Sequence, residues 1–416
     1  MREGWELRKI ADIVEPVSTI DPRKMPGADF TYIDVSAVSR QSHEVVETSL
    51  IRGKDAPSRA RRLVRAGDVI FATIRPTLQR IAEIPPALDG AVCSTGYFVL
   101  RPKARVLTRF LFYSLFSERF SKKIAGLQRG AAYPAVSDAD VKAREILVPP
   151  LPEQKRIVAI LDEAFAGIAT AVANTEKNLA NARRLFESYL NAVFSQRGEG
   201  WTESPLETLV TDSCTLSYGI VQPGSDVRGG IPVVRPTDLR QKLIRRDTLK
   251  TIDPSLAKAY SRTTLHGGDL LLCVRGTTGD LSVAATELEG ANVTRGIVPI
   301  RFNPSLLNQE LGYHLLRSPF VQDQIAEKTY GAALMQINIK DVRKLLVLVP
   351  PHETHEELCS CLNDFSAETD QLQSIYGQKH NALSELKKSL LQKAFSGELT
   401  AGKAAADAMR QVEEIA

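Results

Sequence analysis

Cysteine is scarce in this sequence. The 416 residues include only five cysteines at irregular spacing: Cys93, Cys214, Cys273, Cys359 and Cys361. Small secreted proteins that depend on disulfides use many cysteines at regular spacings, whereas cytosolic proteins keep a few reduced thiols. The cysteine content therefore excludes a disulfide framework and favours a reducing compartment.

Long hydrophobic runs are missing as well. A membrane-spanning helix needs roughly 18 or more consecutive apolar residues, and we find no such run in the sequence. The first residues, MREGWELRKIADIV, lack the apolar stretch of a secretory signal. Hydrophobic residues make up 43% of the chain and charged residues 25%, as in ordinary soluble proteins. We therefore expect a cytoplasmic protein that has no membrane partner.

Motifs of several enzyme classes are also missing. The sequence has no GxxxxGK(S/T) phosphate loop, no GxGxxG dinucleotide loop and no GxSxG nucleophile turn. It has no Asn-Pro-Pro-aromatic tetrapeptide of the kind that amino-methyltransferases use. The letters DEAF at residues 162–165 resemble a helicase box, but without a phosphate loop we interpret them as acidic early turns of a helix. The sequence therefore predicts no catalytic residue.

One group of histidines and cysteines raises the question of a metal site. His352, His355 and Cys359 are spaced so that they share one helix face. Cys361 would lie about 160° away from Cys359 on that helix. No second cluster supplies the remaining ligands of a tetrahedral zinc site. We therefore expect no metal and interpret the group as small thiols and polar histidines near a helix start.

Charge is present but unevenly distributed. Residues 1–150 contain 24 Lys and Arg against 17 Asp and Glu, a net charge of +7. Residues 350–416 contain 6 against 11, a net charge of −5. A basic first part indicates a polyanionic partner, although a solvated basic face gives the same count.

The most informative feature is an internal repeat. Six segments recur in the same order at an offset close to 200 residues: GW (4–5) with GW (200–201), AGDVIFATIRPT (66–77) with GGDLLLCVRGTT (267–278), LFYSLFSERF (111–120) with LGYHLLRSPF (311–320), GAAYPAVSDADV (130–141) with GAALMQINIKDV (331–342), ILVPP (146–150) with VLVPP (347–351), and SYLNAVFS (188–195) with SLLQKAFS (389–396). Collinear matches indicate a duplication, and each half is long enough for a domain with its own core.

Each half changes character once along its length. The first part alternates short apolar strands with Gly/Pro turns and short helices, which is typical of α+β structure. The last part has almost no Gly or Pro and predicts one long helix. We therefore predict an α+β fold in which two duplicated α+β domains are separated by two long antiparallel helices that form a coiled-coil spacer. The predicted parts are a first domain at 1–150, a central spacer helix at 151–197, a second domain at 198–350, a C-terminal spacer helix at 351–400, and an alanine-rich tail at 401–416.

The apolar stripes of both helices favour their mutual packing. In the first helix the gaps alternate between three and four residues, along Ile157, Leu161, Phe165, Ile168, Val172, Thr175, Leu179, Ala182, Leu185, Tyr189 and Val193. The second stripe is interrupted by Thr369 and Lys379. Glycines in SQRGEG and SGELT predict the two helix ends, after Ser195 and Ser396. Neither stripe is stable alone in water at this length, so we expect each helix to cover the other.

The chain resembles the specificity subunits of type I restriction-modification systems. The resemblance rests on the PPLPEQ helix start at 149–154, the two Gly-Asp strands at Gly67 and Gly268, the GAA segments at Gly130 and Gly331, and the duplication itself. It covers roughly residues 1–400. The second helix start departs from the pattern, because HETHEE replaces LPEQ.

The resemblance implies a role without catalysis in this chain. Each α+β domain is a target recognition domain that reads one half of a split double-stranded DNA sequence, and the helices set the gap. The expected partners are modification (methyltransferase) subunits, which use S-adenosylmethionine, and a restriction (motor-nuclease) subunit. No cofactor is expected in this chain. The alternatives are a stand-alone enzyme that modifies or cleaves DNA, and a scaffold without catalysis.

DNA readers use Arg and Lys for phosphates, and Arg, Gln or Asn for base edges. In the first domain we expect such contacts from a basic run, a strand exit and the residues around the GAA segment: Arg59, Arg61, Arg62, Arg75, Arg80, Gln128, Arg129 and Tyr133. The second domain has comparable candidates: Arg228, Arg235, Arg240, Arg275, Gln336 and Asn338. We rank Arg75 and Arg275 highest, because both halves have an arginine where the Gly-Asp strand ends.

The helix start is the candidate methyltransferase dock. The resemblance implies this role for residues of the PPLPEQ segment, namely Pro150, Pro152, Glu153 and Gln154.

Overall fold

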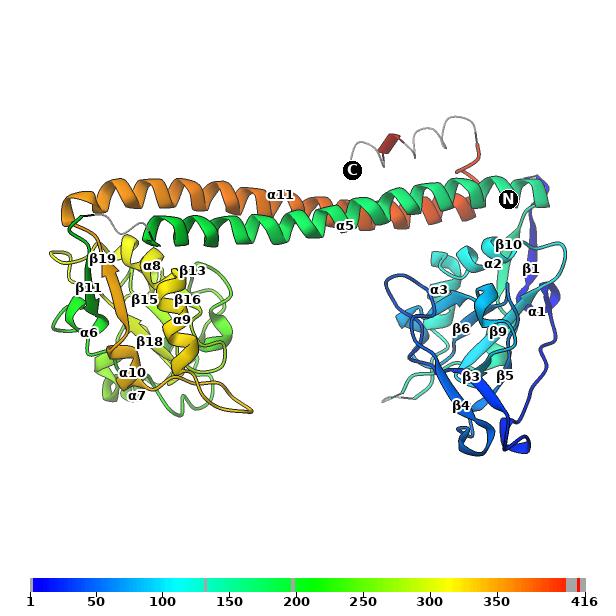
Figure 1. Ribbon diagram of the computed structural model, residues 1–416, viewed down its shortest axis with the longest axis horizontal. Coiled ribbons are helices and arrows are strands. Elements are labelled where there is room, and N and C mark those ends of the chain that lie inside the picture. The colour runs from blue at the N-terminus through cyan, green and yellow to red at the C-terminus, as the bar shows by residue number, and fades with distance from the viewer. Residues whose placement is uncertain (1–2, 131–132, 196–198, 402–409, 412–416) are drawn as a thin grey trace. The chain divides into compact units, whose positions relative to one another are not determined.

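The computed structural model describes residues 3–130, 133–195, 199–401 and 410–411 (Figure 1). The chain forms two compact units, each of mixed helix and sheet. Unit 1 comprises residues 1–176 and 377–416, and unit 2 comprises residues 177–376. The predicted stop at Gly198 and almost all of the predicted tail at 401–416 lie outside the described residues.

Unit 1 begins with short strands and ends with three short helices. Its elements before the long helix are β1 Glu6–Lys9, α1 Ile10–Ile13, β2 Val14–Glu15, η1 Pro22–Lys24, β3 Asp29–Ile33, β4 Ser49–Arg52, η2 Gly53–Asp55, β5 Ala60–Leu63, β6 Val69–Ala72, η3 Pro76–Leu78, β7 Ile81–Glu83, η4 Pro86–Leu88, β8 Val92–Ser94, β9 Tyr97–Pro102, α2 Thr108–Ser114, α3 Glu118–Ala125, α4 Asp138–Lys142 and β10 Glu145–Val148.

The strands of unit 1 form three small sheets. Their strand orders are β1-β10, β2-β9-β6-β7 and β4-β3-β8-β5. All pairs are antiparallel except β3 with β8. Figure 1 shows β1 beside β10, close to the helix that follows β10.

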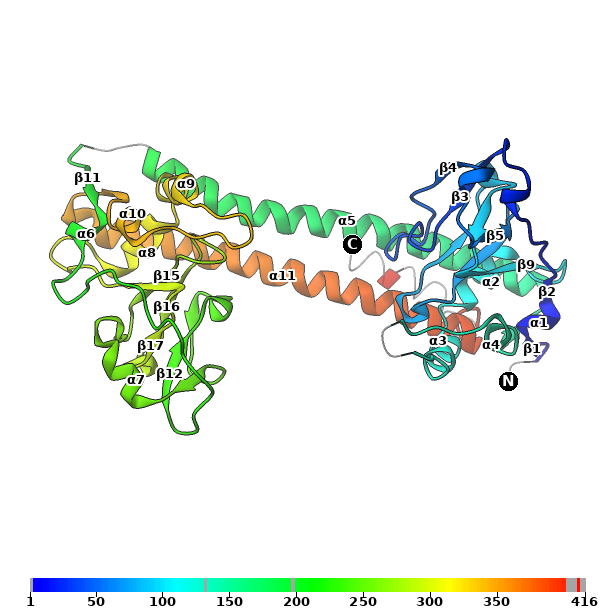
Figure 2. The same ribbon diagram turned by 90° about the horizontal axis from the view of Figure 1, so that it is seen from below.

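Unit 2 has a similar order of elements. They are β11 Thr202–Pro205, α6 Leu206–Leu209, β12 Ile231–Val234, η5 Pro236–Asp238, β13 Leu243–Ile244, β14 Lys250–Ile252, α7 Pro254–Ala259, η6 Ser261–Thr263, β15 Leu270–Cys273, β16 Leu281–Ala284, η7 Thr286–Leu288, β17 Asn292–Val293, β18 Ile297–Ile300, α8 Gln309–Arg317, α9 Pro319–Lys328, α10 Ile339–Arg343, β19 Leu346–Val349 and η8 His352–Thr354. Its sheets are β11-β19, β14-β12-β17 and β13-β16-β15-β18. Figure 2 shows β12, β17 and α7 together on the side away from α8 and α9.

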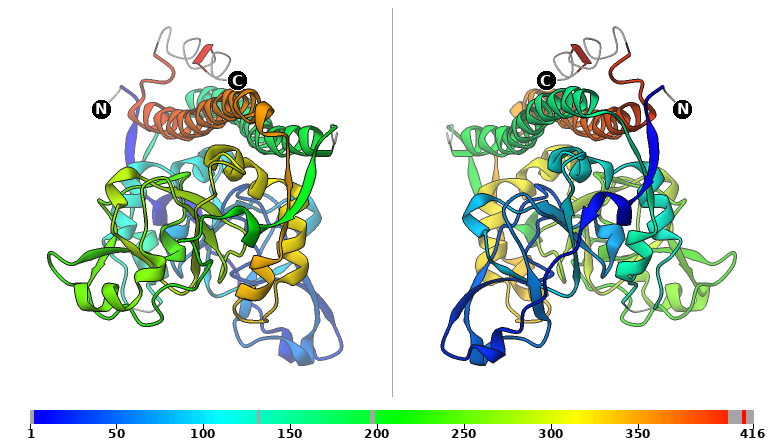
Figure 3. Two further views of the ribbon diagram at one scale, coloured as in Figure 1. Left: turned by 90° about the vertical axis from the view of Figure 1, so that its left-hand side faces the viewer. Right: turned by 90° about the vertical axis from the view of Figure 1, so that its right-hand side faces the viewer.

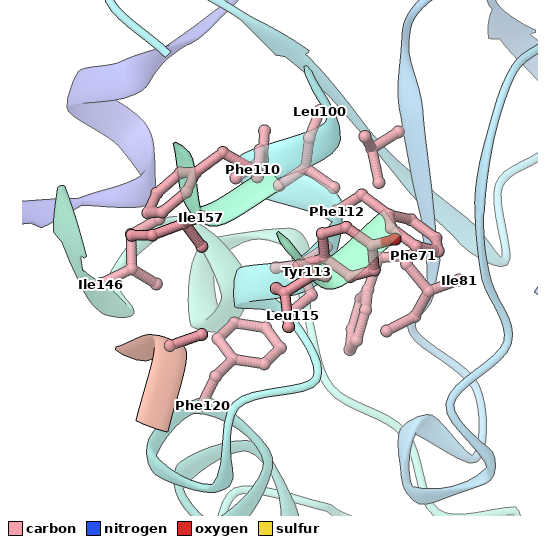
Figure 4. Packing of buried hydrophobic residues seen from close by; sticks show 14 of the residues in the cluster. Phe71, Ile81, Leu100, Phe110, Phe112, Tyr113, Leu115, Phe120, Ile146 and Ile157 are labelled. Atoms are coloured by element: carbon pink, nitrogen blue, oxygen red, sulfur yellow. The ribbon is translucent and has the colours of Figure 1, made fainter. Parts of the chain in front are cut away.

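Each unit buries its own hydrophobic core. In unit 1 the helix α2 supplies Phe110, which meets Ile146 of β10 and Ile157 of the long helix (Figure 4). Phe71 of β6 packs edge-on against Phe120 of α3, with ring centroids 5.5 Å apart. Full burial of one such side chain contributes roughly 1.5–3 kcal/mol, so the sheets and short helices form one body.

Two long helices take part in both units. They are α5 Leu151–Ser195 and α11 His355–Ser396, as the sequence predicts. In unit 1, Glu153 contacts Thr400 and Glu176 lies near His380, so α5 and α11 run antiparallel. In the end-on views of Figure 3 the two helices lie side by side. Gly397, with φ of 84°, ends α11 as the SGELT pattern predicts.

The predicted apolar stripe of α5 is correct only in its first two thirds. Ile157, Leu161, Ile168, Thr175 and Ala182 are buried. Further along, Leu185 is 47% exposed, and the next residue, Phe186, is buried instead. The buried side shifts because Phe186, Leu190 and Phe194 pack into the core of unit 2. Thr369, expected to interrupt the second stripe, is buried with its hydroxyl bonded to Ser366 O.

The helix α5 also corrects the expectation that no apolar segment is long enough to cross a membrane. An 18-residue window within Leu151–Phe194 has a mean hydropathy of 1.5, so α5 passes a test of length and composition. One such helix is weak evidence for a membrane, and Ile157, Leu161, Ala164 and Ile168 pack in a protein core.

Both Gly-Asp turns contain a buried ion pair. Asp68 receives two hydrogen bonds from Arg101, at 2.8 and 2.7 Å, and Asp269 receives two from Arg301, at 2.7 and 2.6 Å. The hydrogen bond to Asp68 raises the pKa of the Arg101 guanidinium. Each aspartate also accepts a hydrogen bond from the backbone N–H three residues before it. The Gly-Asp repeat is therefore structural.

Candidate nucleic-acid interface

The loops that follow β6 and β15 begin with equivalent backbone hydrogen bonds. We call residues 73–80 exit loop 1 and residues 274–280 exit loop 2. The N–H of Thr73 donates to Gly96 O, and the N–H of Val274 donates to Gly296 O, both at 2.8 Å. The next bonds also match, from Arg75 N to Pro134 O and from Gly276 N to Met335 O.

This shared pattern shows that the two arginines are not equivalent. Arg75 occupies the position of Gly276, and Arg275 occupies the position of Ile74. The two arginines were ranked together because each follows a Gly-Asp strand, although the matched segments 66–77 and 267–278 already place Arg75 opposite Gly276. Arg75 has a left-handed backbone, whereas Arg275 lies in a bridge with Gln336, so the two side chains leave their loops differently. The match of residues 111–120 with 311–320 is out of register by one residue. It places Glu118 opposite Ser318, but Ser117 is the residue that precedes α3 in the way that Ser318 precedes α9.

Exit loop 1 presents its arginine together with an exposed tyrosine. Arg75 has a left-handed backbone, with φ of 50°. Its guanidinium carbon lies 5.0 Å from the ring centroid of Tyr133, which is 70% exposed. Arg129, on the strand that pairs with Ala135, is also exposed. An arginine stacked on an exposed aromatic ring suits contacts with bases and phosphates.

Exit loop 2 presents its arginine beside a short hairpin. Tyr330 and Gln336 form the closing pair of this hairpin through two backbone hydrogen bonds of 2.9 and 2.8 Å. Arg275 pairs with Gln336 as an isolated bridge. The Nε of Arg275 is buried and has no hydrogen-bond partner among the described residues. The predicted pair of Arg275 and Gln336 is therefore brought together.

Several predicted arginines of unit 1 have partners within the protein, including the exposed Arg129, whose Nη2 lies 3.6 Å from Asp140 Oδ1. Arg61 forms an ion pair with Asp21, and Arg62 forms one with Asp138 at 2.5 Å. Arg80 donates from Nη1 to the carbonyl oxygen of Ser36 at 2.5 Å. These contacts fix loops. Of the candidates Arg59, Arg61 and Arg62, only Arg59 is exposed and without an ion pair among the described residues.

The remaining candidates divide in the same way. Gln128 is half-buried and donates to Ala125 O at 3.2 Å. Arg235 is held by Asp238 at 2.8 Å, and Asn338 caps α10 by accepting from Lys340 N. Arg228 and Arg240 are exposed.

Gln154 of the predicted dock is fully buried. Its amide oxygen accepts from Leu107 N at 2.9 Å, and its nitrogen donates to the carbonyl oxygens of Arg105 and Pro149 at 2.9 and 2.8 Å. The side chain is thus not offered to a partner, because it joins the helix start to the loop before α2. His355 has the same place in unit 2, 3.0 Å from Pro350 O.

The other three docking candidates lie nearer the surface. Pro150 and Pro152 are exposed, while Glu153 is half-buried and contacts Arg156 and Thr400.

In each unit, a side-chain contact that the sequence did not predict joins a short helix to a long helix: α2 to α5 in unit 1, and α8 to α11 in unit 2. In unit 1 the hydroxyl of Tyr113 donates to Asp162 at 2.5 Å, and Arg109 Nε donates to the same oxygen at 2.9 Å. In unit 2, His314 Nε2 lies 3.0 Å from Asn363 Oδ1. Burial is the main cause that lowers the pKa of His314, to about 4. A register of 201 residues throughout would have revealed that these pairs correspond.

The histidine and cysteine group near residue 355 has no metal-site geometry. Among the described residues, no three His, Cys, Asp or Glu side chains lie close enough to hold a metal ion. Burial raises the pKa of Cys359 to about 11, which disfavours the thiolate that a metal needs.

Comparison with known proteins gives the class of this fold. Residues 2–179 match the family of the type I restriction modification DNA specificity domain.

Curated relatives extend the similarity beyond residue 179. The chain is 26% identical to the EcoKI specificity subunit of Escherichia coli strain K12, over 96% of this chain and 90% of that subunit. It is also 26% identical to the Escherichia coli EcoBI specificity subunit, but that match covers 61% of this chain and only 58% of the relative's length.

Two solved structures are also similar to this chain over nearly its whole length. A chain from a study of complex assembly and conformational transition of the type I R-M system matches with a TM-score of 0.82 and 27% identity, over 96% of this chain and 99% of that chain. The HsdS subunit of Thermoanaerobacter tengcongensis matches with a TM-score of 0.60 and 27% identity, over 96% and 98%.

Proposed function

We propose that this chain is the DNA sequence-specificity subunit of a type I restriction-modification complex. The main support is that exit loops 1 and 2 begin with equivalent backbone hydrogen bonds but present different side chains. The family match at residues 2–179 and the near full-length similarity to specificity subunits support the assignment.

Each unit then reads one half of a split target. The α+β parts are duplicated target recognition domains, at about residues 1–150 and 198–350. Bidentate arginine contacts distinguish guanine, and Gln distinguishes adenine, in the major groove. Unit 1 uses Arg75 with Tyr133, and unit 2 uses Arg275 with Gln336. Because these sets differ, the target is asymmetric.

The two long helices act as an antiparallel coiled-coil spacer between the readers. At 1.5 Å per residue, a helix of 45 residues is on the order of 65 Å long. DNA advances about 3.4 Å per base pair. A continuous helix therefore converts its length into a fixed number of unread base pairs.

The chain itself carries out no catalysis. Modification subunits supply adenine methylation with S-adenosylmethionine, and a motor-nuclease subunit supplies restriction. Pro150, Pro152 and Glu153 contribute to the methyltransferase dock, whereas Gln154 acts inside the protein. The complex works in the cytoplasm.

Co-expression with the cognate methyltransferase subunit and mapping of modified adenines tests this function. We expect a bipartite, asymmetric methylation motif. The purified chain alone is the control, since a chain that methylates or cuts DNA by itself would establish the alternative of a stand-alone enzyme. Retention of all duplexes with equal affinity by the complex would favour a scaffold.

A further inference from the structure

A polar cavity of about 540 Å³ lies within unit 2. Its lining comes from the second part of α5, the segment before β13, the start of β16, and the helices α8 and α9, which Figure 1 labels in unit 2. One water occupies about 30 Å³ of liquid, so the cavity has room for a phosphodiester group. It is separate from the arginine positions at exit loops 1 and 2 described above.

Three cationic side chains line this cavity. They are Arg240, Lys242 and Arg317. Within residues 3–130, 133–195, 199–401 and 410–411, none of the three forms an ion pair. Two carboxylates, Glu187 and Asp280, also line the cavity, and both are solvent-exposed. The cations therefore exceed the carboxylates, and none of them is neutralised by direct contact.

Arg317 is held in place by aromatic rings. Its guanidinium carbon lies 5.1 Å from the ring centroid of Phe186 and 5.2 Å from that of Tyr313. Its Nη1 donates to the hydroxyl of Tyr313 at 3.3 Å. Lys242 Nζ lies 5.2 Å from the centroid of the same ring. The remaining N–H donors of the guanidinium are available to a ligand. Because the side chain is already held in place, anion binding costs less conformational entropy.

The cavity is continuous with exit loop 2. Gly279 and Asp280, at the end of that loop, are part of the cavity lining. Gln322 of α9 donates to Gly279 O at 3.1 Å, which fixes the loop against the helix. Arg275 stands at the other end of the same loop. A DNA strand whose base meets Arg275 thus has its backbone close to the cavity.

We propose that this cavity binds a backbone phosphate of DNA beside the bases read by exit loop 2. The proposal rests on the proposed function. Guanidinium and ammonium groups are the usual phosphate ligands, and a phosphate contact sets register without reading sequence. Arg317 and Lys242 bind the phosphate, with Arg240 at the rim.

The equivalent place in unit 1 differs in chemistry. There a cavity of about 520 Å³ is lined by Phe116, Ser121 and Lys388. At an offset of 201 residues, these three positions correspond to Arg317, Gln322 and Glu187 of the unit 2 cavity. Phe116, between α2 and α3, has no charge where unit 2 has Arg317. The two lysines of this lining, Lys387 and Lys388, are matched in number by Glu118 and Glu385, and Lys388 forms an ion pair with Glu385 at 2.7 Å. We therefore expect the phosphate contact of this type in unit 2.

The test is the salt dependence of binding of the full chain to a duplex of arbitrary sequence. Fluorescence anisotropy between about 50 and 200 mM KCl gives the slope of log affinity against log salt. The variant Lys242→Ala/Arg317→Gln should reduce the slope by about 0.9, the value for one phosphate. This corresponds to an affinity that falls about eightfold less per tenfold rise in salt.

A matched control removes two exposed cations of unit 2 that do not line the cavity, with Lys258→Ala/Arg262→Ala. Its slope should equal that of the wild type. Arg317→Lys keeps the charge and should keep the slope, which separates phosphate binding from loss of packing. Circular dichroism melts establish that each variant is folded.

Equal slopes for the cavity variant and the wild type would overturn the proposal. The same conclusion follows if the cavity variant loses only its binding to the methyltransferase subunit, because a partner carboxylate would then be the ligand. A wild-type chain without any salt-dependent DNA binding would instead contradict the proposed function.

Discussion

Exit loop 1 and exit loop 2 begin with equivalent backbone hydrogen bonds but differ in length and in side chains. Both loops close through equivalent hydrogen bonds to a glycine carbonyl and to a second loop. At the equivalent turn position unit 1 has Arg75, with φ of 50°, and unit 2 has Gly276, with φ of 97°. The start of each loop therefore serves as a common frame, and a shift of one residue in the position of an arginine changes the direction in which its side chain points.

The attachment of the short helices to the long helices shows the same contrast. Unit 1 uses a charged acceptor, Asp162, with donors from Tyr113 and Arg109. Unit 2 uses the neutral pair His314 and Asn363. Charge-assisted hydrogen bonds are roughly twice as strong as neutral ones, so the two attachments respond differently to acid and to substitution.

The largest effect is expected where the two units are most alike, at the buried ion pairs. Asp68→Ala and Asp269→Ala remove the ion-pair partners of Arg101 and Arg301. Each change should lower the free energy of unfolding by about 2–4 kcal/mol, somewhat less than for fully buried pairs because both arginines are partly exposed. Urea titration followed by circular dichroism measures this. Asp55→Ala, at an exposed position, is the control, and a loss below 1 kcal/mol would show that the pairs are dispensable.

Acid should distinguish the two attachments. The pKa of His314 is about 4 when folded and about 6.5 as the ordinary value. The unfolded chain therefore binds more protons between these values, and the contribution of His314 is present above pH 6.5 and lost as pH falls toward 4. The loss reaches about 3 kcal/mol.

The substitution His314→Gln removes the titrating imidazole and with it this pH-dependent contribution to stability. Stability of the wild type and the variant, measured from pH 4 to pH 8, should converge on the acid side. Tyr113→Phe in unit 1 is the matched control, since the Tyr113 pKa is raised, chiefly by burial, and lies far above this range. Parallel pH curves for His314→Gln and the wild type would contradict the assignment.

Removal of each arginine should separate the two readers. Arg75→Ala should relax recognition of one half-site only, and Arg275→Ala the other, with a loss of about 1–3 kcal/mol in discrimination. Adenine methylation mapping of the co-expressed complex measures both. Arg62→Ala serves as the control for a paired arginine. Unchanged methylation at both half-sites would remove Arg75 from the interface.

The smallest effect concerns the backbone of the exit loops. Arg75→Gly should be about 1 kcal/mol more stable than Arg75→Ala, because only glycine adopts positive φ without strain. Gly276→Ala should be destabilising by a similar amount, although open space surrounds the added Cβ. Thermal melts measure both changes, and equal melting temperatures for Arg75→Gly and Arg75→Ala would show that this turn is unstrained.

The sequence predicts the elements better than the contacts. Helical spacing and proline or glycine ends located α5 and α11 within a few residues, because these signals are local. The Gly-Asp turns were found, but their ion pairs were not, since Arg101 is 33 residues from Asp68. Tertiary pairing likewise decided that Arg62 meets Asp138 and is not a free reader.

The residue-by-residue register between the two halves was the second feature that the sequence did not predict reliably. Arg75 and Arg275 both follow a Gly-Asp strand, but the matched segments 66–77 and 267–278 place Arg75 opposite Gly276, and the backbone hydrogen bonds confirm this register. Register also explains why Leu185 is exposed and Phe186 is buried. A spacing of three to four residues continues through the whole helix, but the second part of α5 packs against a different core from the first part.

The buried contacts at the start of α5 limit how freely this fold can exchange parts between relatives. A foreign domain joined before Pro149 would still face Gln154 and Asp162 of the host helix. It would need backbone groups placed like Leu107 N and Arg105 O, and a hydroxyl placed like that of Tyr113. New DNA specificities can thus be assembled by recombination only among domains that keep this joint, however different their reading loops.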